Sequence, residues 1–364
     1  MRHALLALTF SLTLAQSIAA KEHKLKPESV NEQGVSATRA EKCATRAQCD
    51  PEIAVNRLGS GPIIFPGMPG LDPAIGHNIN GPSLIRVPDW VERPLGRYYL
   101  YFSNHQGGYI EMAYADALTG PWHIYQGGVL PLGKTAAIEH VASPDVIIDH
   151  QQQRLVMYFH GPTENPAEKG QYYDQATFVA HSSDGLSFTA DPRPLSDAYL
   201  RAFEWQGRRY GLAMAMKESA YPALLRSGQF FRATDRQFAF EQGPRILDEM
   251  RHGAVLVRGH KLHILFTQVG DKPERIYHST VDLRPDWSEW TASPPREVLR
   301  PVKGYEGAHL PLSASRSGNA ASMENALRDP AIFVEGNKTY LLYAVGGEKG
   351  IALAEIRFLD APSS

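Results

Sequence analysis

A strand–turn–strand pattern recurs five times along this chain, and the repetition limits the folds that the chain can adopt. Each copy has a polar or proline-containing start, an apolar strand, a short turn rich in glycine or basic residues, and an aromatic strand. The clearest copy covers residues 328–343 (RDPAIFVEGNKTYLLY), and an earlier copy covers residues 81–102. Repeats of this length are typical of solenoids, propellers and other arrays, in which each unit buries its apolar face against the next.

The spacing of the copies favours a propeller. We take Pro82, Pro144, Ala202, Gly253 and Pro330 as equivalent points, which gives steps of 62, 58, 51 and 77 residues. Each step is long enough for a four-stranded blade and its loops. Asp-Gly and Gly-Pro turns bound the second hairpins, and no helical period is sustained after residue 60. We therefore expect an all-β fold, a five-bladed β-propeller over residues 58–364 preceded by a short N-terminal arm over residues 20–57.

The first 19 residues predict export from the cytoplasm. Residues 1–3 are a short positive start, and residues 4–15 are apolar apart from Thr and Ser. Ser17 and Ala19 then supply small side chains at positions −3 and −1 of a cleavage site. This pattern is typical of a secretory signal peptide and is too short for a membrane span. We expect a secreted or periplasmic protein.

Composition excludes some partners. The formal net charge is −2 and no basic run is present, which argues against nucleic acid and against an anionic membrane surface as partners. Cys43 and Cys49 are the only cysteines, and in an oxidising compartment we expect them to pair. Two cysteines alone are a poor zinc site.

Polar side chains gather where the blade topology predicts a common rim. The start of each innermost strand and the end of each second strand should lie on one face of a propeller, and convergent polar groups there indicate a site. The candidate substrate-binding residues in these places are Asn80, His105, His140, His160, Arg201, His252 and Arg328. Two readings stay open. The arginines could bind a sugar carboxylate or sulfate, or they could only neutralise nearby acids. The other polar groups could simply satisfy strand-end backbone atoms.

Four short motifs carry a family resemblance. They are Arg328-Asp329-Pro330, Ser143-Pro144-Asp145, the hairpin at 113–122 (AYADALTGPW) and residues 183–188 (SDGLSF). Because these motifs recur in blade order, the chain resembles the five-bladed propeller glycoside hydrolases of families 32, 43, 62, 68 and 117, and most of all families 43 and 117. The resemblance implies an enzyme acting on furanose or related exo-linked sugar residues. It also implies three axial carboxylates, which in family 43 are an Asp base, an Asp that tunes the acid, and a Glu acid.

The three carboxylates of family 43 do not all have a counterpart at the same position of this sequence. At the first blade, where family 43 has its Asp-Pro base, this chain has Gly81-Pro82 preceded by Asn80. The Pro-Asp of the second blade gives Asp145 as the tuning residue. The Asp-Pro reappears at the fifth blade, which makes Asp329 the expected base.

The expected acid is Glu306, with Glu204 as the alternative. Glu306 lies on the long insertion before the fifth blade, and long loops in compact folds are often functional. One of the histidines could instead be the acid, as the resemblance to family 117 allows. Acid and base on opposite sides of the axis should stand about 6.5–9.5 Å apart, which predicts inversion of the anomeric configuration.

The sequence therefore predicts an exo-acting, inverting glycoside hydrolase whose partner is an oligo- or polysaccharide. It requires no cofactor, although an axial calcium or other cation is conceivable. One rival is a glycoside phosphorylase or transferase on the same scaffold, because a phosphate cradle could form from Arg201, Lys217, Arg251 and His252. The other rival is a non-catalytic carbohydrate-binding propeller, because the amide of Asn80 cannot act as a general base.

Overall fold

The computed structural model describes residues 52–359 apart from 106, 165–171, 218–224 and 235–238. The described residues all belong to one compact unit, residues 49–364. The signal peptide, most of the arm, and Cys43 and Cys49 lie outside the described residues.

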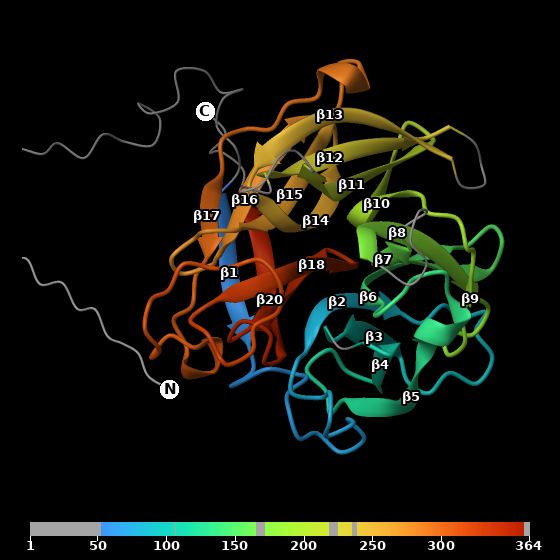
Figure 1. The fold of residues 1–364 in the computed structure, drawn as a ribbon, viewed down its shortest axis with the longest axis vertical. Helices are drawn as coiled ribbons and strands as arrows, with labels where there is room; N and C mark the ends of the chain where they lie inside the picture. The colour runs from blue at the N-terminus through green and yellow to red at the C-terminus, as the bar shows by residue number, and fades with distance from the viewer. Residues whose placement is uncertain (1–51, 106, 165–171, 218–224, 235–238, 360–364) are drawn as a thin grey trace, which may run out of the picture. The chain divides into compact units, whose positions relative to one another are not determined.

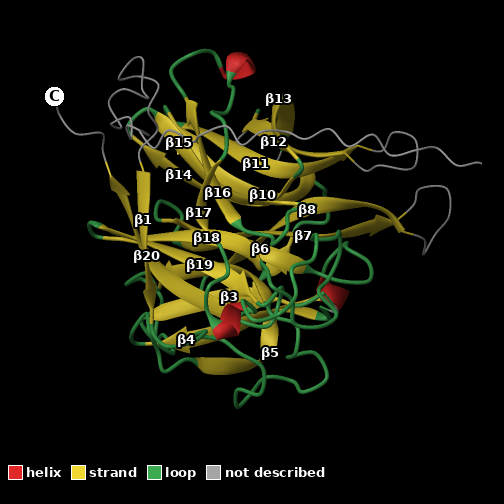
Figure 2. Ribbon diagram, turned by 90° about the vertical axis from the view of Figure 1, so that its left-hand side faces the viewer, coloured by secondary structure: helices red, strands yellow, loops and turns green. Residues whose placement is uncertain are grey.

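Strands make up nearly all of the regular structure in the described part of the chain (Figure 2). They fall into five groups, and the first four are as follows. Groups 1 and 2 consist of β2 (Asn80–Arg86), β3 (Tyr98–Ser103), β4 (Tyr109–Ala115) and β5 (His123–Pro131), and of β6 (Ala142–Asp149), β7 (Arg154–Glu164), β8 (Tyr172–Ser182) and β9 (Thr189–Ala190), respectively. Group 3 consists of β10 (Ser196–Trp205), β11 (Arg208–Lys217), β12 (Leu225–Ala233) and β13 (Phe240–Asp248). Group 4 consists of β14 (Met250–Arg258), β15 (Lys261–Gln268), β16 (Ile276–Asp282) and β17 (Arg296–Leu299).

Group 5 combines the two ends of the described chain. It consists of β18 (Leu327–Glu335), β19 (Lys338–Val345), β20 (Ile351–Leu359) and β1 (Glu52–Leu58). The helices that the structure describes are three short 3₁₀ turns, η2 (Leu132–Lys134), η3 (Trp287–Glu289) and η4 (Gly304–Glu306). None of the helices in these described ranges is long and apolar enough to cross a membrane. The all-β prediction is confirmed.

Neighbouring strands pair antiparallel within each group, in chain order. Groups 2 and 3 are joined into one eight-stranded sheet by two residue pairs between β8 and β10. The first strand of each group lies near a common centre (Figure 1), and each contacts the next in the order β2, β6, β10, β14, β18 and again β2. The starts of these five strands are therefore brought close together.

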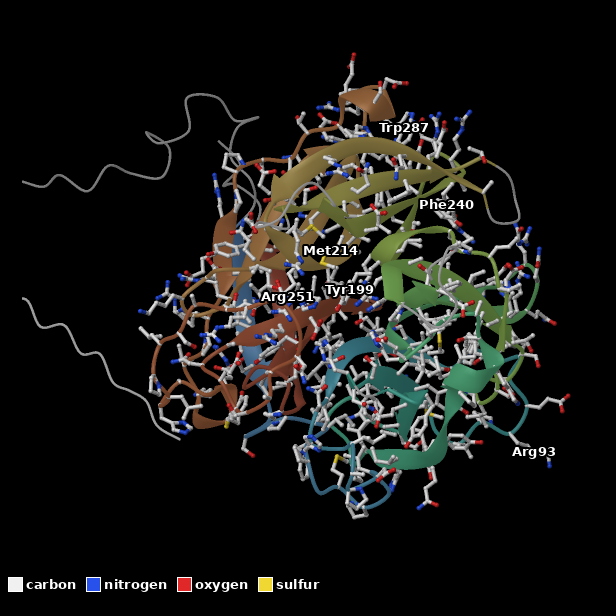
Figure 3. All side chains as sticks on the ribbon, in the orientation of Figure 1. Arg93, Tyr199, Met214, Phe240, Arg251 and Trp287 are labelled. Carbon is white, nitrogen blue, oxygen red and sulfur yellow. The ribbon has the colours of Figure 1, made fainter. Side chains whose placement is uncertain are left out.

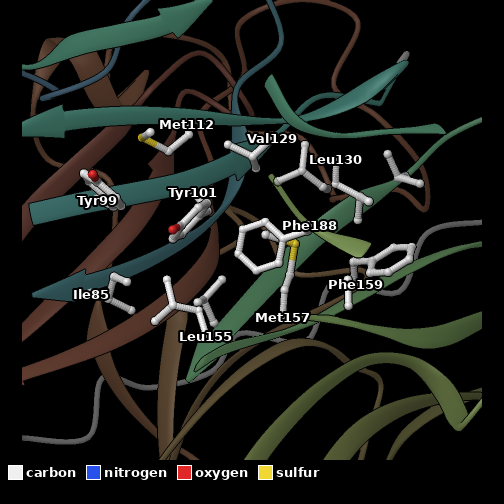
Figure 4. Packing of buried hydrophobic residues seen from close by; sticks show 14 of the residues in the cluster. Ile85, Tyr99, Tyr101, Met112, Val129, Leu130, Leu155, Met157, Phe159 and Phe188 are labelled. Atoms are coloured by element: carbon white, nitrogen blue, oxygen red, sulfur yellow. The ribbon is translucent and has the colours of Figure 1, made fainter. Parts of the chain in front are cut away.

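Five apolar cores lie between successive groups. The core between groups 1 and 2 includes Tyr99, Tyr101 and Met112 packed against Met157 and Phe159 (Figure 4). Equivalent cores join groups 2 and 3, groups 3 and 4, groups 4 and 5, and groups 5 and 1. Because both faces of each group are covered, the strand sequences are runs of apolar residues and do not alternate between polar and apolar residues.

Each first strand carries a bulge at the same place, where two of its residues face one residue of the second strand. The bulge residues are Gly81–Pro82, Ser143–Pro144, Tyr199–Leu200, Arg251–His252 and Asp329–Pro330. Leu200 and His252 thus correspond to the three prolines. Our sequence alignment of the copies, which used Ala202 and Gly253, is wrong by two residues and by one residue respectively.

The N-terminal strand completes group 5. β1 pairs with β20 from Glu52 opposite Leu359 to Leu58 opposite Leu353. The stretch from residue 52 to 57, which we assigned to the arm, is therefore a strand of the sheet. Ile53 and Val55 of this strand pack against the core between groups 4 and 5, and the partner strand is at the other end of the chain.

Glu306 fastens β1 to the rest of group 5. Its side chain is fully buried and accepts hydrogen bonds from Arg57 Nε at 2.7 Å and from the Tyr343 hydroxyl at 3.1 Å. The backbone N–H groups of Val302 and Lys303 also donate to it, at 2.8 and 3.0 Å. Four donors from three segments thus converge on one carboxylate, which is a structural arrangement.

We expect Glu306→Ala to lower the free energy of unfolding by about 3–5 kcal/mol, because it leaves a largely buried arginine without its partner. The matched control is Glu204→Ala, which removes a carboxylate that is 66% exposed and whose ion-pair partner among the described residues is Arg209. That change should lower the stability by less than about 1 kcal/mol. Urea unfolding of both variants measures the difference, and equal losses would contradict the role assigned to Glu306.

Candidate active site at the strand bulges

The first residue of the two-residue bulge has a left-handed backbone conformation in four of the five groups. The φ angles are +45° at Asp329, +47° at Ser143, +56° at Gly81 and +61° at Tyr199. Residues other than glycine adopt this conformation rarely, and such positions cluster at functional sites. The bulges thus turn these side chains away from the strand ladder, and Figure 3 shows Tyr199 and Arg251 lying near the centre of the described unit.

Asp329 and His252 form a buried pair at the centre of this region. Oδ1 of Asp329 lies 3.0 Å from Nε2 of His252, and the two side chains are 3% and 2% exposed. Oδ2 of Asp329 and Nδ1 of His252 are buried and have no hydrogen-bond partner among the described residues. One oxygen of the carboxyl group is therefore fixed, and the other has no partner among the described residues.

The electrostatics of the pair favour an uncharged state. Burial, reinforced by the charge of Glu348, raises the pKa of Asp329 to about 6, although Arg251 opposes this. Burial, followed by the charges of Arg251 and Arg328, holds the pKa of His252 well below its usual range. A neutral imidazole can donate Nε2–H to Asp329 Oδ1 across the 3.0 Å contact.

An ion-pair network of two arginines and two glutamates lies beside this pair. Arg328 contacts Glu274 through Nε at 2.8 Å and Glu348 through Nη1 at 2.9 Å. Arg251 contacts the same Glu274 oxygen at 3.3 Å and lies 3.8 Å from Glu348. Burial alone would raise the pKa of Glu348, but His105, Arg328 and Asn78 hold it far below its usual range. Glu348 is thus a fixed negative charge next to Asp329.

Amide side chains extend the network toward groups 1 and 2. Asn78 donates to Glu348 at 2.7 Å, and Asn80 donates to Asn78 at 2.8 Å. Ser103 donates to Asn80 Oδ1 at 2.8 Å, and Nδ2 of Asn80 also lies 3.0 Å from Nδ1 of His105. Asn80 therefore has its hydrogen-bonding groups occupied by protein atoms, which supports a structural role instead of a substrate-binding role.

A row of rings leads from the partly exposed His140 to Asp329. Ring centroids are 6.2 Å apart for His140 and His160, 4.0 Å for His160 and Tyr199, and 4.8 Å for Tyr199 and His252. Burial, with a smaller effect from His105, lowers the pKa of His140 to about 4, and burial holds the pKa of His160 well below its usual value. All three imidazoles are therefore uncharged at neutral pH.

Asp145 has a different environment. Its Oδ2 accepts a hydrogen bond from the Ala202 N–H at 3.1 Å, and its Oδ1 lies 3.7 Å from Arg201. The equivalent residue of group 1, Ser83, accepts from the Val146 N–H at 2.8 Å in the same way. Both side chains therefore satisfy a backbone donor of the next group, which supports a structural role for Asp145.

Arg201 also links neighbouring groups. It donates to the carbonyl oxygens of Pro144 at 2.8 Å and Gly253 at 3.0 Å, and it is almost fully buried. Two of the predicted site residues, Asp145 and Arg201, are thus explained by contacts between first strands.

Glu306 and Glu204 do not join this cluster. The contacts of Glu306 are to Arg57, Tyr343 and the 302–303 backbone, and Arg57 is on β1, three strands away from Asp329. Strands are spaced about 4.8 Å apart, so β1 lies about 14 Å from β18. Glu204 is exposed at the far end of β10. The structure does not support either glutamate as the acid.

Gly81 shows why family 43's first-blade aspartate has no counterpart here. A Cβ added to Gly81 would lie 2.7 Å from Cα of Ser143 and 2.9 Å from its hydroxyl oxygen. Groups 1 and 2 therefore approach too closely for a side chain at this bulge. The carboxylate at an equivalent bulge is Asp329, on group 5.

Sequence reasoning did not assign roles to Tyr199, Glu274 and Glu348. Glu348 follows the second strand of its group, which is one of the positions that the blade topology predicts on the common rim. Tyr199 was missed because no proline marks the third bulge. Glu274 is in the β15–β16 loop, and no local pattern signals its burial. Among the described residues, no group of three or more His, Cys, Asp or Glu is arranged to hold a metal ion, so an axial cation stays a prediction.

The fold places the chain in a structural class. Similar solved structures include a thermostable family-43 glycoside hydrolase (TM-score 0.54, 11% identity, covering 79% of this chain and 95% of that one). They also include an α-L-arabinofuranosidase from Lactobacillus brevis (0.53, 13%, 76% and 90%) and a family-43 enzyme of Xanthomonas citri complexed with xylotriose (0.52, 12%, 83% and 90%). The chain has the fold of the family-43 glycoside hydrolases, as its motifs predicted. No protein-family model matches it.

A closer relative is viral. The chain is 32% identical over 345 residues to the uncharacterized protein R118 of Acanthamoeba polyphaga mimivirus, covering 85% of this chain and 92% of that protein. The chain belongs to the same family as this viral protein.

We expect Asp145→Ala to lower the free energy of unfolding by about 1–3 kcal/mol, because it leaves the Ala202 N–H without an acceptor. Asp145→Ser should lose less than half of that, since Ser83 makes the same bond in group 1. Urea unfolding measures both losses. A serine variant as unstable as the alanine variant would contradict this role.

Proposed function

We propose that this protein is a glycoside hydrolase on a closed five-bladed propeller, with Asp329 as the general acid. The observation that carries the proposal is the state of Asp329. It is a buried carboxyl group whose pKa is raised to about 6, whose Oδ1 is fixed by His252, and whose Oδ2 is unpartnered. Glycoside hydrolysis requires such a protonated carboxyl group to protonate the leaving oxygen. The five cores and the ring of first strands support the closed propeller.

The surroundings of Asp329 suit this role after proton transfer as well. Once Asp329 has given its proton to the glycosidic oxygen, the Nε2–H of His252 can donate to the new carboxylate. Arg251 and Arg328 lower the pKa of Asp329, and the same attraction stabilises its negative charge. The group is therefore a proton donor whose charged product is also accommodated.

Water is the nucleophile in this proposal, and His160 accepts its proton. His160 contacts the ring of Tyr199, which also contacts His252; burial keeps His160 uncharged, and its Nδ1 has no partner among the described residues. A retaining reaction would need a second free carboxylate about 5–5.5 Å from the acid. Glu348 is bound at both oxygens, by Arg328 and Asn78, and Glu274 is paired with Arg328 and Arg251 through Oε2, although its Oε1 has no partner among the described residues. We therefore propose direct attack by water with inversion.

The signal peptide predicted over residues 1–19 supports a secreted or periplasmic enzyme acting on oligo- or polysaccharides. The α-L-arabinofuranosidase and the xylotriose complex among the similar structures make arabinosyl and xylosyl residues the first substrates to test. A phosphorylase gains little support, because Arg201 and Arg251 donate to backbone carbonyls of the protein.

One observation favours a second candidate function, a carbohydrate-binding propeller without turnover. Of the five first bulge positions, only Asp329 has a carboxylate, whereas the resemblance to family 43 implies three at the axis. Binding of oligosaccharides without release of a monosaccharide at any pH would support this candidate and refute the hydrolase.

We expect Asp329→Asn to reduce kcat by about 10²–10⁴-fold, which is the usual contribution of a general acid. The assay is release of monosaccharide from xylo-, arabino-, galactofuranosyl and algal oligosaccharides. Asp145→Asn is the matched control and should retain wild-type kcat in the folded fraction, because its amide oxygen can still accept from Ala202. Loss of activity in Asp145→Asn but not in Asp329→Asn would reverse the assignment.

The pH dependence follows from the raised pKa. Asp329 must be protonated to act, so kcat/KM should fall as the pH rises above about 6. The folded state binds this proton more tightly than the unfolded state, in which an Asp has a pKa of about 3.9. Wild-type stability should therefore fall between about pH 4 and 6 as the pH rises, relative to Asp329→Asn. Activity that stays constant to pH 8, with no such stability difference, would show that Asp329 is not the acid.

A further inference from the structure

A polar groove lies between groups 2 and 3, at the ends of their first strands that are remote from the bulges. Its walls include the β6–β7 turn, the β10–β11 turn, the end of β12 and the start of β13, and its volume is about 980 Å³. Asp149 lines the groove and follows the bulge residue Ser143 along β6 by about 20 Å, at about 3.3 Å per residue. The groove is therefore separate from the Asp329 site, and its size is that of a ligand pocket.

Positive charge exceeds negative charge among the residues that line this groove. Each of its three carboxylates is paired with an arginine, and the pairs are Arg154–Asp149 at 3.2 Å, Arg209–Glu204 at 3.1 Å and Arg232–Glu241 at 2.6 Å. A fourth arginine, Arg208, is exposed and forms no ion pair with a described residue. Burial, followed by the charge of Arg154, lowers the pKa of His181, and the exposed His150 can only add positive charge. Four arginines and three carboxylates leave one unbalanced positive charge.

Two of these ion pairs can exchange their anion. The side chain of Glu204 is 66% exposed and that of its partner Arg209 is 30% exposed. The side chain of Glu241 is 43% exposed and that of its partner Arg232 is 22% exposed. Ion pairs between exposed side chains are weak because water and salt screen them. The anionic group of a ligand can therefore take the place of either glutamate.

The arginines of these two pairs have further contacts that hold them in place. The guanidinium carbon of Arg232 lies 4.2 Å from the centroid of the Trp287 ring. Nη1 of Arg209 donates to the hydroxyl oxygen of Tyr158 at 3.4 Å. Both guanidinium groups are therefore supported when a glutamate turns away. Planar donor groups of this kind bind a carboxylate or sulfate through two hydrogen bonds at once.

We propose that this groove is a second binding site, for a glycan unit that carries a carboxylate or sulfate group. The anionic group is expected at Arg208, Arg209 and Arg232. The half-buried ring of Phe240 offers apolar surface to the C–H groups of the sugar, and Gln152 offers an amide to its hydroxyl groups. The choice of a glycan rests on the proposed function, whereas the choice of an anion rests on the charges of the groove. A polymer bound here is held by the enzyme without filling the catalytic centre.

The test is calorimetric titration of the full chain with matched oligosaccharides, in an Asp329→Asn background that prevents cleavage. The probes are galacturonate, sulfated galactose and neutral galactose oligosaccharides of the same length, so that carboxylate and sulfate are compared directly. Inorganic sulfate and a short single-stranded DNA are the anions without a glycan. We expect at least one acidic series to occupy a site that the neutral series does not occupy, with an affinity that falls as the salt concentration rises.

Three variants assign this binding to the groove. Arg208→Gln removes the unbalanced charge and should weaken binding of the acidic oligosaccharides at least about tenfold, while binding of the neutral series stays within about twofold. Glu204→Gln releases Arg209 and should strengthen acidic binding about threefold. Arg97→Gln is the matched control, because Arg97 follows Gly96 in the β2–β3 turn as Arg208 follows Gly207 in the β10–β11 turn, and it should have no effect. Thermal unfolding confirms that the variants are folded.

The outcomes distinguish this inference from the hydrolase proposal. Acidic binding that is absent, unchanged in Arg208→Gln or weaker in Glu204→Gln would overturn the inference. Tighter binding of sulfate or DNA than of any acidic oligosaccharide would also overturn it, because the ligand would not be a glycan. With Asp329 intact, Arg208→Gln should keep wild-type kcat on short neutral substrates, so hydrolysis is tested separately. A protein that binds acidic glycans but cleaves no sugar would refute the hydrolase and keep the inference.

Discussion

The guanidinium group of Arg328 is the contact on which the arrangement of the site depends. It binds glutamates from three separate segments, which are the β15–β16 loop (Glu274), the stretch before β18 (Glu324) and the turn after β19 (Glu348). Charges buried in this way are tolerated only when their partners are well placed. The network therefore fixes the backbone on both sides of Asp329. It also keeps Glu348 ionised, and that charge helps to raise the pKa of Asp329.

The same architecture explains why the site differs from that implied by the family resemblance. The bulges in the five first strands provide five positions for a side chain at the centre, and the residue at one position can change without a change at the others. Here the close approach of groups 1 and 2 leaves Gly81 without space for a side chain, and Ser143 and Tyr199 occupy the next two positions. The only carboxylate among the first residues of the five bulges is Asp329 of group 5, which contacts His252 of group 4.

The sequence predicted the fold better than the site, and particular residues show why. Hairpin turns and apolar runs are local signals, so the all-β repeat could be read directly. The bulges of groups 3 and 4 lack a proline, so the copies were misaligned there and Tyr199 was overlooked. Glu306 was predicted to be the acid because it lies on a long insertion. Its burial, however, depends on Arg57, which is 249 residues away in the sequence. Ion pairs and burial arise from tertiary contacts, which no single-sequence pattern reports.

The pairing of β1 with β20 has a consequence for the life of the polypeptide. Seven residues near the start of the described chain can find their partners only after the last strand has been made. Until then β1 has no partner strand, and an unpaired strand edge can pair with a strand from another molecule. Contacts of such long sequence separation also form slowly. Synthesis and folding of this protein therefore pass through a period in which four strand groups can be complete while the fifth remains open, and this is when a folding helper would have most effect.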